Sequence, residues 1–274
     1  MDKTLFVVAT PIGNLEDTSL RAIKTLKSVD YILAEDTRRT KILLDHYGVT
    51  TSTMSLHKFN ERERLEEVKR LFEKYQNIAL VSDAGTPLIS DPGAIIVDYA
   101  LDNHIKVAPV PGVSALTALI SISGFSLSEQ GLITFVGFLP HTEKAKIKLL
   151  GECLSNKQTV VFFESPNRVI KTLNLIAELS PTSTVVLGRE LTKIYEETIR
   201  FEAQNYPKDI KERGEFTLLV TPGKKPIEIE KFTVFDPAKN EPRKIASILA
   251  NYLNIKQKKA YDLLVKLKTE HKME

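Results

Sequence analysis

The chain has 274 residues, of which 42% are hydrophobic and 27% charged, a composition typical of a globular protein that excludes wholesale disorder. Its one cysteine, Cys153, excludes an internal disulfide and a cysteine-rich metal cluster and indicates a reducing, cytoplasmic compartment. Residues 1–223 carry 26 Lys and Arg against 28 Asp and Glu, whereas residues 224–274 carry 12 against 7, so this basic tail predicts a polyanionic partner, nucleic acid first.

No segment reads as a targeting or membrane-spanning element. The apolar run near the N-terminus is too short for a signal peptide. No apolar stretch approaches the ~20 residues that a membrane helix needs. We therefore expect no membrane partner.

The first 118 residues alternate apolar runs with amphipathic runs. Strands are predicted at 5–9, 31–34, 78–81 and 107–110, and helices around 20–26, 41–47, 65–72 and 94–101. Strands that alternate with helices in this way are typical of an α/β domain with a largely parallel sheet.

A second α/β domain with some antiparallel character is predicted over residues 119–223. Its strands are expected at 133–138, 160–163, 184–188, 197–202 and 215–220, and its helices at 145–154 and 169–179. We expect the last two strands to pair with each other. A Pro- and Gly-rich linker follows at 222–226, and residues 224–274 carry two short helices, over 245–253 and from 260 onward, that predict a small helix-turn-helix-like domain.

Three loops rich in Pro and Gly follow predicted strands, at 9–15, 82–93 and 110–118. Open α/β sheets bind ligands at the carboxyl ends of their strands, so each loop is a candidate binding loop. Taken alone, the first and third loops are better explained by strand-to-helix turns. The second places two Asp, two Pro and two Gly in Asp83–Gly93, which favours a ligand. No G-x-G occurs, so an ordinary dinucleotide site and a Walker loop are excluded.

A charged stretch follows the second predicted strand. Glu35 and Asp36 precede Arg38 and Arg39, and residues 55–62 add a mixed polar and aromatic set further on. Arginines at a sheet edge can bind phosphates, and the mixed set suits nucleobases. A solvated start of a helix explains the same residues equally well. No zinc-ligand spacing and no nucleophile elbow occurs.

Eight motifs stand in order along the chain: T-P-I-G-N-L, A-E-D-T-R, S-L-H-x-x-N-E, S-D-A-G-T-P-x-I-S-D-P-G, V-P-G-x-S-A, F-x-G-F-L-P, F-F-E-S-P-x-R and G-R-E-L-T-K. This series, from Leu5 to about Val220, resembles the tetrapyrrole methylase superfamily, in particular a branch that methylates small-subunit ribosomal RNA. The tail resembles that branch's C-terminal helical domain. The resemblance implies two α/β domains with S-adenosylmethionine in the cleft between them, homodimers, and methylation of a cytidine ribose 2′-hydroxyl in 16S ribosomal RNA, with no metal.

Carried over motif by motif, the resemblance also implies site residues. The donor site would comprise Pro11, Gly13, Asp83, Ala84, Gly85, Thr86, Pro87, Pro111, Gly112, Ser114, Ala115, Phe163, Glu164, Arg189, Glu190 and Leu191. Since a ribose hydroxyl must lose a proton, a base is needed. The sequence leaves four candidates for it, which are Glu35, Asp36, His57 and Glu190.

Basic and polar residues at two places are expected to contact RNA: Arg38, Arg39, Lys58, Asn60, Arg62, Arg243, Lys244, Lys256, Lys258 and Lys259. The tail lysines lie at the start of a predicted helix, where cations oppose the helix dipole. RNA phosphate would offset that cost, which favours an RNA contact over the alternative that these lysines serve solubility alone.

Two other functions remain open at this point. A relative could methylate a tetrapyrrole or another small substrate, but the basic tail and the A-E-D-T-R-R stretch favour RNA. A non-catalytic RNA-binding ribosome assembly factor would not need the intact S-D-A-G-T-P and V-P-G-V-S-A loops. A knotted methyltransferase fold would place its donor motifs near the C-terminus, whereas the strongest loops here precede Ala118.

Overall fold

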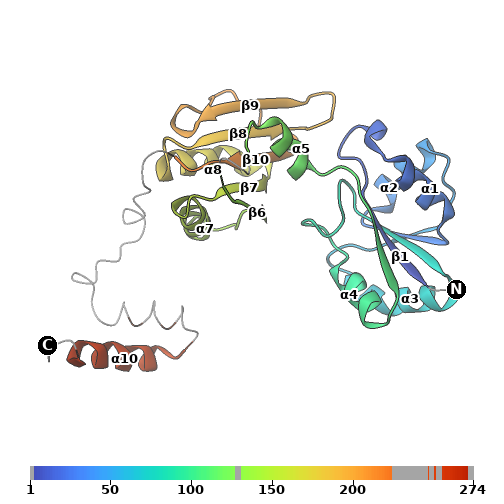
Figure 1. The fold of residues 1–274 in the computed structure, drawn as a ribbon, viewed down its shortest axis with the longest axis horizontal. Coiled ribbons are helices and arrows are strands. Elements are labelled where there is room, and N and C mark those ends of the chain that lie inside the picture. The colour runs from blue at the N-terminus through green and yellow to red at the C-terminus, as the bar shows by residue number, and fades with distance from the viewer. Residues whose placement is uncertain (1–2, 127–130, 224–245, 247–249, 251–254, 271–274) are drawn as a thin grey trace. The chain divides into compact units, whose positions relative to one another are not determined.

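The computed structural model describes residues 3–126, 131–223, 246, 250 and 255–270 (Figure 1). By their contacts, Met1–Ile227 form one compact unit and Glu228–Glu274 a second. The first unit holds two five-stranded sheets. The strands of its first half lie within residues 4–110 and those of its second half within residues 133–220. The predicted α/β class with helices near the C-terminus is confirmed.

The first sheet has the order β3-β2-β4-β1-β5, and all its pairs are parallel. Its strands are β1 (Thr4–Val8), β2 (Tyr31–Ala34), β3 (Thr53–Ser55), β4 (Asn77–Val81) and β5 (Lys106–Val110). Four of them match the predicted strands. The fifth, β3, is missed by the sequence pattern because it is only three residues long and half-buried throughout.

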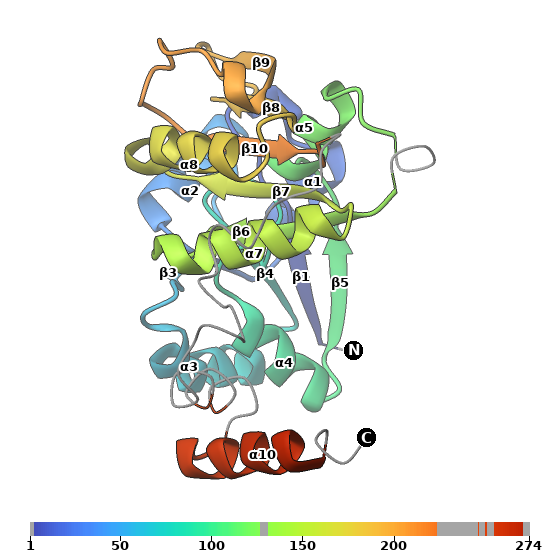
Figure 2. The ribbon, with the colours of Figure 1, turned by 90° about the vertical axis from the view of Figure 1, so that its left-hand side faces the viewer.

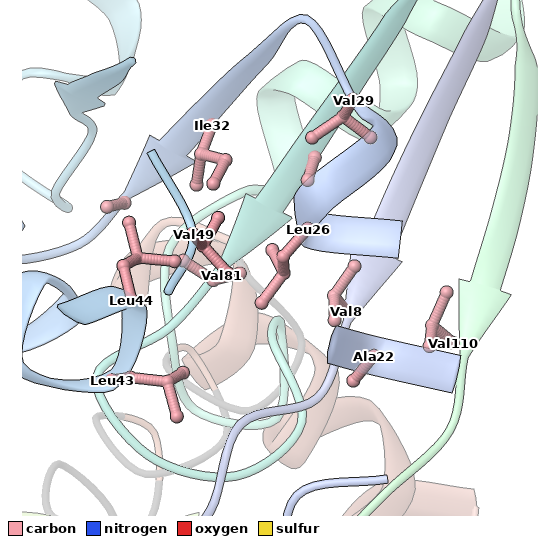
Figure 3. Packing of buried hydrophobic residues seen from close by; sticks show 12 residues of the cluster. Val8, Ala22, Leu26, Val29, Ile32, Leu43, Leu44, Val49, Val81 and Val110 are labelled. Carbon is pink, nitrogen blue, oxygen red and sulfur yellow. The ribbon is translucent and has the colours of Figure 1, made fainter. Parts of the chain in front are cut away.

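Helices cover both faces of this sheet: α1 (Leu20–Ser28) and α2 (Thr37–His46) on one face, α3 (Glu61–Lys74) and α4 (Ala94–Asp102) on the other. Successive residues of β2 face opposite sides of the sheet: Ile32 packs with the α1–α2 side (Figure 3). Leu33, the next residue, packs with the α3–α4 side. Figure 2 shows α3 and α4 side by side. Burial on both faces explains why the strands read as continuous apolar runs.

The second sheet has the order β6-β7-β10-β8-β9, and only its β6–β7 pair is parallel. Its elements are β6 (Ile133–Phe138), α7 (Glu143–Ser155), β7 (Thr159–Glu164), α8 (Pro166–Leu179), β8 (Thr184–Arg189), β9 (Glu197–Glu202) and β10 (Phe216–Val220).

The expected pairing of the last two strands is wrong, because β8 lies between β9 and β10. All five residues of β10 are buried, as befits a central strand, and it bonds to β7 and β8. By contrast, every residue of β9 is at least partly exposed, which is typical of an edge strand.

Helix α5 (Ala115–Ile122) packs against the second sheet. Its Leu119 is fully buried in one hydrophobic cluster with Val161 of β7 and Leu219 of β10. The division expected between residues 118 and 119 falls inside this helix. The third Pro-Gly loop therefore leads from the last strand of the first sheet directly into the core of the second half.

In the second unit the structure describes α10 (Gln257–Glu270), which corresponds to the second predicted tail helix. Of the first, at 245–253, only Ala246 and Ala250 are described; both are buried and packed with Ala260. Arg243 and Lys244 lie outside the described residues. Among the helices that are described, none is long and apolar enough to cross a membrane.

Candidate functional site

A cavity of about 410 Å³ lies at the carboxyl ends of β2 and β4 and is lined by residues of both halves of the first unit. Nine of the predicted donor-site residues line it: Asp83, Ala84, Gly85, Thr86, Ser114, Ala115, Phe163, Glu164 and Leu191. A neighbouring cavity of about 200 Å³ is lined by Pro11 and Gly13. It shares Ile12, Arg39 and Asp83 with the larger one. The structure thus brings the three Pro-Gly loops together.

Close backbone approach explains the glycines in these loops. Gly85 has φ +83°, in the left-handed region, and exchanges backbone hydrogen bonds of 2.9 and 3.0 Å with Thr10 in the first loop. A Cβ on Gly112 of the third loop would lie 3.0 Å from the Cβ of Ala9. The glycines therefore let the three loops pack against one another at the cavity.

The remaining predicted donor-site residues line neither cavity. They are Pro87, Pro111, Gly112, Arg189 and Glu190. The side chain of Arg189 is buried and donates from Nε to Oε2 of Glu197 at 2.8 Å. Glu190 accepts from Lys193 Nζ at 2.9 Å and from the Glu215 amide at 3.0 Å. Burial acts to raise the pKa of Glu190, but these donors outweigh it and the pKa lies below its ordinary value.

The ends of β2 and β4 exchange hydrogen bonds through two carboxylates. The amide of Asp36 donates to Oδ1 of Asp83 at 2.9 Å, and the amide of Asp83 donates to Oε2 of Glu35 at 3.2 Å. Arg39 Nη1 lies 3.5 Å from Oδ2 of Asp83. Burial raises the pKa values of both Glu35 and Asp83. Two carboxylates and one arginine therefore share one rim of the cavity.

A third carboxylate on the same wall, Asp91, is absent from the sequence-based candidates. It lines the cavity, and burial, followed by the charge of Glu35, raises its pKa to about 7. Ser82 hydrogen-bonds to it and acts in the opposite direction. The signal in the sequence is the second Asp of the S-D-A-G-T-P-L-I-S-D-P-G loop, which stands before a Pro-Gly pair and so reads as part of a turn.

On the opposite wall, Glu164 at the end of β7 is fully enclosed by donors. Oε1 accepts from Arg168 Nε at 2.6 Å, and Oε2 accepts from the Thr172 hydroxyl at 2.8 Å and from Lys146 Nζ at 3.4 Å. The Ser165 amide also donates to Oε1, at 2.8 Å. This carboxylate is satisfied by the protein itself and ties β7 to α7 and α8.

Of the four base candidates, only Glu35 lines the cavity. Asp36 is held by Arg38, whose side-chain hydrogen bonds keep the pKa of Asp36 well below its usual range. The Nδ1 atom of His57 is buried without a hydrogen-bond partner.

The residues expected to contact RNA fall into three groups. Arg38, Lys58 and Arg62 are exposed, as are Lys256, Lys258 and Lys259 at the start of α10. Asn60 is half-buried and its Oδ1 accepts from the His57 amide at 2.8 Å. Arg39 lines both cavities and has an exposed side chain. Beside Lys58, Phe59 is 90% exposed.

In the part of the chain that the structure describes, no three His, Cys, Asp or Glu side chains are grouped so that they could hold a metal ion.

Residues 4–206 match the family model for tetrapyrrole (corrin/porphyrin) methylases, and the chain belongs to this family. A diphthine synthase structure matches with a TM-score of 0.64 and 15% identity, over 84% of this chain and 93% of that one. A cobalt precorrin-4 methyltransferase matches at 0.58 and 17%, over 80% and 94%. At these identities the two structures show the shared fold.

Sequence relatives narrow the family further. Ribosomal RNA small subunit methyltransferase I of Thermotoga maritima is 41% identical over 220 residues, which cover 79% of this chain and 97% of the relative. The protein of the same name from Mesorhizobium japonicum is 36% identical over 277 residues, 98% of this chain and 93% of the relative. The chain belongs to this branch of the family, and the second match extends through the tail.

Proposed function

We propose that the chain transfers a methyl group from S-adenosylmethionine to the 2′-hydroxyl of a cytidine ribose in 16S ribosomal RNA. The observation that carries this is the meeting of the three Pro-Gly loops with the second half at one cavity, in a chain whose relatives over most of its length carry an rRNA methyltransferase name. The proposal treats the small ribosomal subunit as partner, the chain as a homodimer and the reaction as independent of metal.

The residues at the cavity suit this donor. A volume of about 410 Å³ is in the range of small-molecule sites. Ala84, Gly85 and Ala115 leave room for close approach of the ligand to the backbone. Ile12 and Leu191 offer apolar surface to an adenine ring. The donor carries a positive sulfonium, and the carboxylates of Glu35 and Asp83 on the wall of the first half complement that charge.

The acceptor side is supported by exposed cations. Arg38, Lys58 and Arg62 lie on segments that follow β2 and β3 and can contact phosphates, while the exposed ring of Phe59 can stack on a base. Because the sulfonium is already activated, the protein needs only to align the hydroxyl with the methyl carbon and to remove a proton.

The function is tested with purified protein, S-adenosylmethionine labelled in the methyl group, and small ribosomal subunits. We expect calorimetric donor binding and label in 16S RNA at a ribose. Asp83→Ala should weaken donor binding by about 1.5–3 kcal/mol, the range for an interaction with a charged group, since it removes a carboxylate that complements the sulfonium. The control is Asp98→Ala, an exposed residue of α4. A folded wild-type protein that binds no donor would instead be a non-catalytic factor, and label confined to a small molecule would contradict the RNA acceptor.

A further inference from the structure

Five carboxylates line the large cavity: Glu35, Asp83, Asp91, Glu164 and Glu215. Methylation of a ribose hydroxyl releases one proton, so a group at the cavity must accept it. Such a group needs a carboxylate oxygen that protein donors do not already occupy. It also needs surroundings that favour its neutral form after the proton arrives.

Three of the five carboxylates fail these requirements. Glu164 is enclosed by hydrogen-bond donors and two cations. Glu215 has a side chain 66% exposed and lies 3.1 Å from Lys193 Nζ. Oδ1 of Asp83 accepts from the Asp36 amide and Oδ2 is paired with Arg39, so each of its oxygens already has a protein partner.

Of the two remaining carboxylates, Glu35 and Asp91, Asp91 has fewer protein donors and cations at its oxygens. Burial raises the pKa of Glu35 as well, but its Oε2 accepts from the Asp83 amide and the charge of Arg39 favours its ionised form. Asp91 forms no ion pair with any described residue, and its partner is the neutral hydroxyl of Ser82. Its charged neighbours are carboxylates, which disfavour a second negative charge and so favour uptake of a proton.

The backbone holds Asp91 at the cavity from both sides. Leu88 and Ser90 have φ +70° and +77°, which places two non-glycine residues in the left-handed region immediately before it. After it, the buried Glu61 carboxylate accepts from the amides of Gly93 and Ile95, at 3.1 and 2.8 Å. A loop fixed at both ends can place a carboxylate accurately, as positioning catalysis requires.

On this geometry, and resting on the proposed function, we infer that Asp91 is the catalytic proton acceptor of the methyl transfer. Its carboxylate takes the proton of the ribose 2′-hydroxyl while the oxygen–carbon bond to the methyl group forms and the carbon–sulfur bond breaks. The products are the 2′-O-methyl ribose, neutral S-adenosylhomocysteine and the protonated Asp91. One positive and one negative charge disappear together.

The ionisable groups that share the cavity set the pH range in which Asp91 works. They are Glu35 after β2, Arg39 on α2, Asp83 after β4, Glu164 at the end of β7 and Glu215 before β10. With a pKa of about 7, raised by burial and by the charge of Glu35, Asp91 is ionised above neutrality and still basic enough to accept a proton.

The test is single-turnover methyl transfer to small subunits by the full chain, measured from pH 5.5 to 8.5. The wild-type rate should rise about tenfold per pH unit below about pH 7 and level off above it, since only the carboxylate form of Asp91 is active. Asp91→Asn should lower the plateau rate on the order of 10²–10⁴-fold. It should also abolish this inflection while donor affinity stays within about threefold.

Two further variants make the result specific. Asp98→Asn on α4 is the matched control and should keep both rate and profile. Glu35→Gln should keep the inflection, shifted to lower pH because a like charge near Asp91 is removed.

Three outcomes overturn the inference. In the first, Asp91→Asn retains the rate and the profile. In the second, its donor affinity falls as far as its rate, which makes Asp91 a donor ligand. In the third, the inflection disappears in Glu35→Gln, which makes Glu35 the base. Absence of transfer by the wild-type chain would overturn the proposed function as well, so the two failures are distinguishable.

Discussion

The two walls of the cavity differ in how far the charges of their carboxylates are compensated by neighbouring cations and hydrogen-bond donors. On the wall of the second half, Glu164 is compensated by Lys146 and Arg168 and bonded through both of its oxygens. On the wall of the first half, Arg39 is paired with Asp83, whereas Glu35 and Asp91 lie near each other and form no ion pair among the described residues. The first arrangement stabilises a position in the fold, whereas the second keeps a carboxylate near its titration range. The same residue type therefore serves structure on one wall and chemistry on the other.

The largest expected effect on stability comes from removing Glu164, the compensated carboxylate on the wall of the second half. Glu164→Ala leaves the side chain of Lys146, which is 8% exposed, without its carboxylate. Loss of one partner of a buried ion pair typically lowers stability by about 3–5 kcal/mol. The free energy of unfolding in urea measures this. Glu152→Ala, which removes an exposed ion pair with Lys148 on the same α7, should change it by less than about 1 kcal/mol. Equal losses in the two variants would contradict the contrast between buried and exposed pairs.

The second effect is a gain in stability, and it concerns Asp91 on the wall of the first half. Because the pKa of Asp91 is raised in the folded protein, the folded state binds a proton between about pH 4 and 7 that the unfolded state has released. Because the folded state holds more protons in this window, the free energy of unfolding falls as pH rises from about 4 to 7. Asp91→Asn should raise Tm, by an amount that grows from pH 4 to 7 and is constant above. A lower Tm at pH 8, or a gain independent of pH, would contradict the raised pKa.

The smallest effect concerns the tail. Replacing Lys256, Lys258 and Lys259 with Ala should leave donor binding unchanged and weaken RNA binding. The log–log slope of RNA affinity against salt should become shallower by about 0.7–0.9 for each phosphate that the variant no longer neutralises. Replacing the exposed Lys24 and Lys27 of α1 provides the control. Unchanged slopes would leave α10 as a packing element.

The sequence predicts those features of the fold that depend on neighbouring residues, and it fails for those that depend on residues far apart in the chain. Strands such as β1 and β4 are local apolar runs, and the pattern finds them. Strand pairing depends on residues far apart in the sequence. We expected β9 and β10 to pair because they follow each other in the chain, but β8 lies between them in the sheet. Four of the five residues of β10 are apolar, which is typical of a central strand, whereas β9 alternates polar and apolar residues.

The candidate site shows the same limit. The Pro-Gly loops are visible as motifs, and their residues do meet at the cavity. Asp91 reads as a turn residue because its special character comes from burial and from Glu35, which lies 56 positions earlier in the chain. In the same way, Glu164 reads as a ligand contact until Lys146 and Thr172 are seen to occupy it. Residue type is local, whereas protonation and occupancy depend on tertiary neighbours.

The most direct measurement is mass mapping of ribose methylation in 16S RNA from cells that lack this chain. We predict that one 2′-O-methylcytidine is absent, that the wild-type chain restores it, and that Asp83→Ala, expected to weaken donor binding, restores it poorly. A 16S RNA with unchanged ribose methylation, or full restoration by a variant that no longer binds S-adenosylmethionine, would contradict the account.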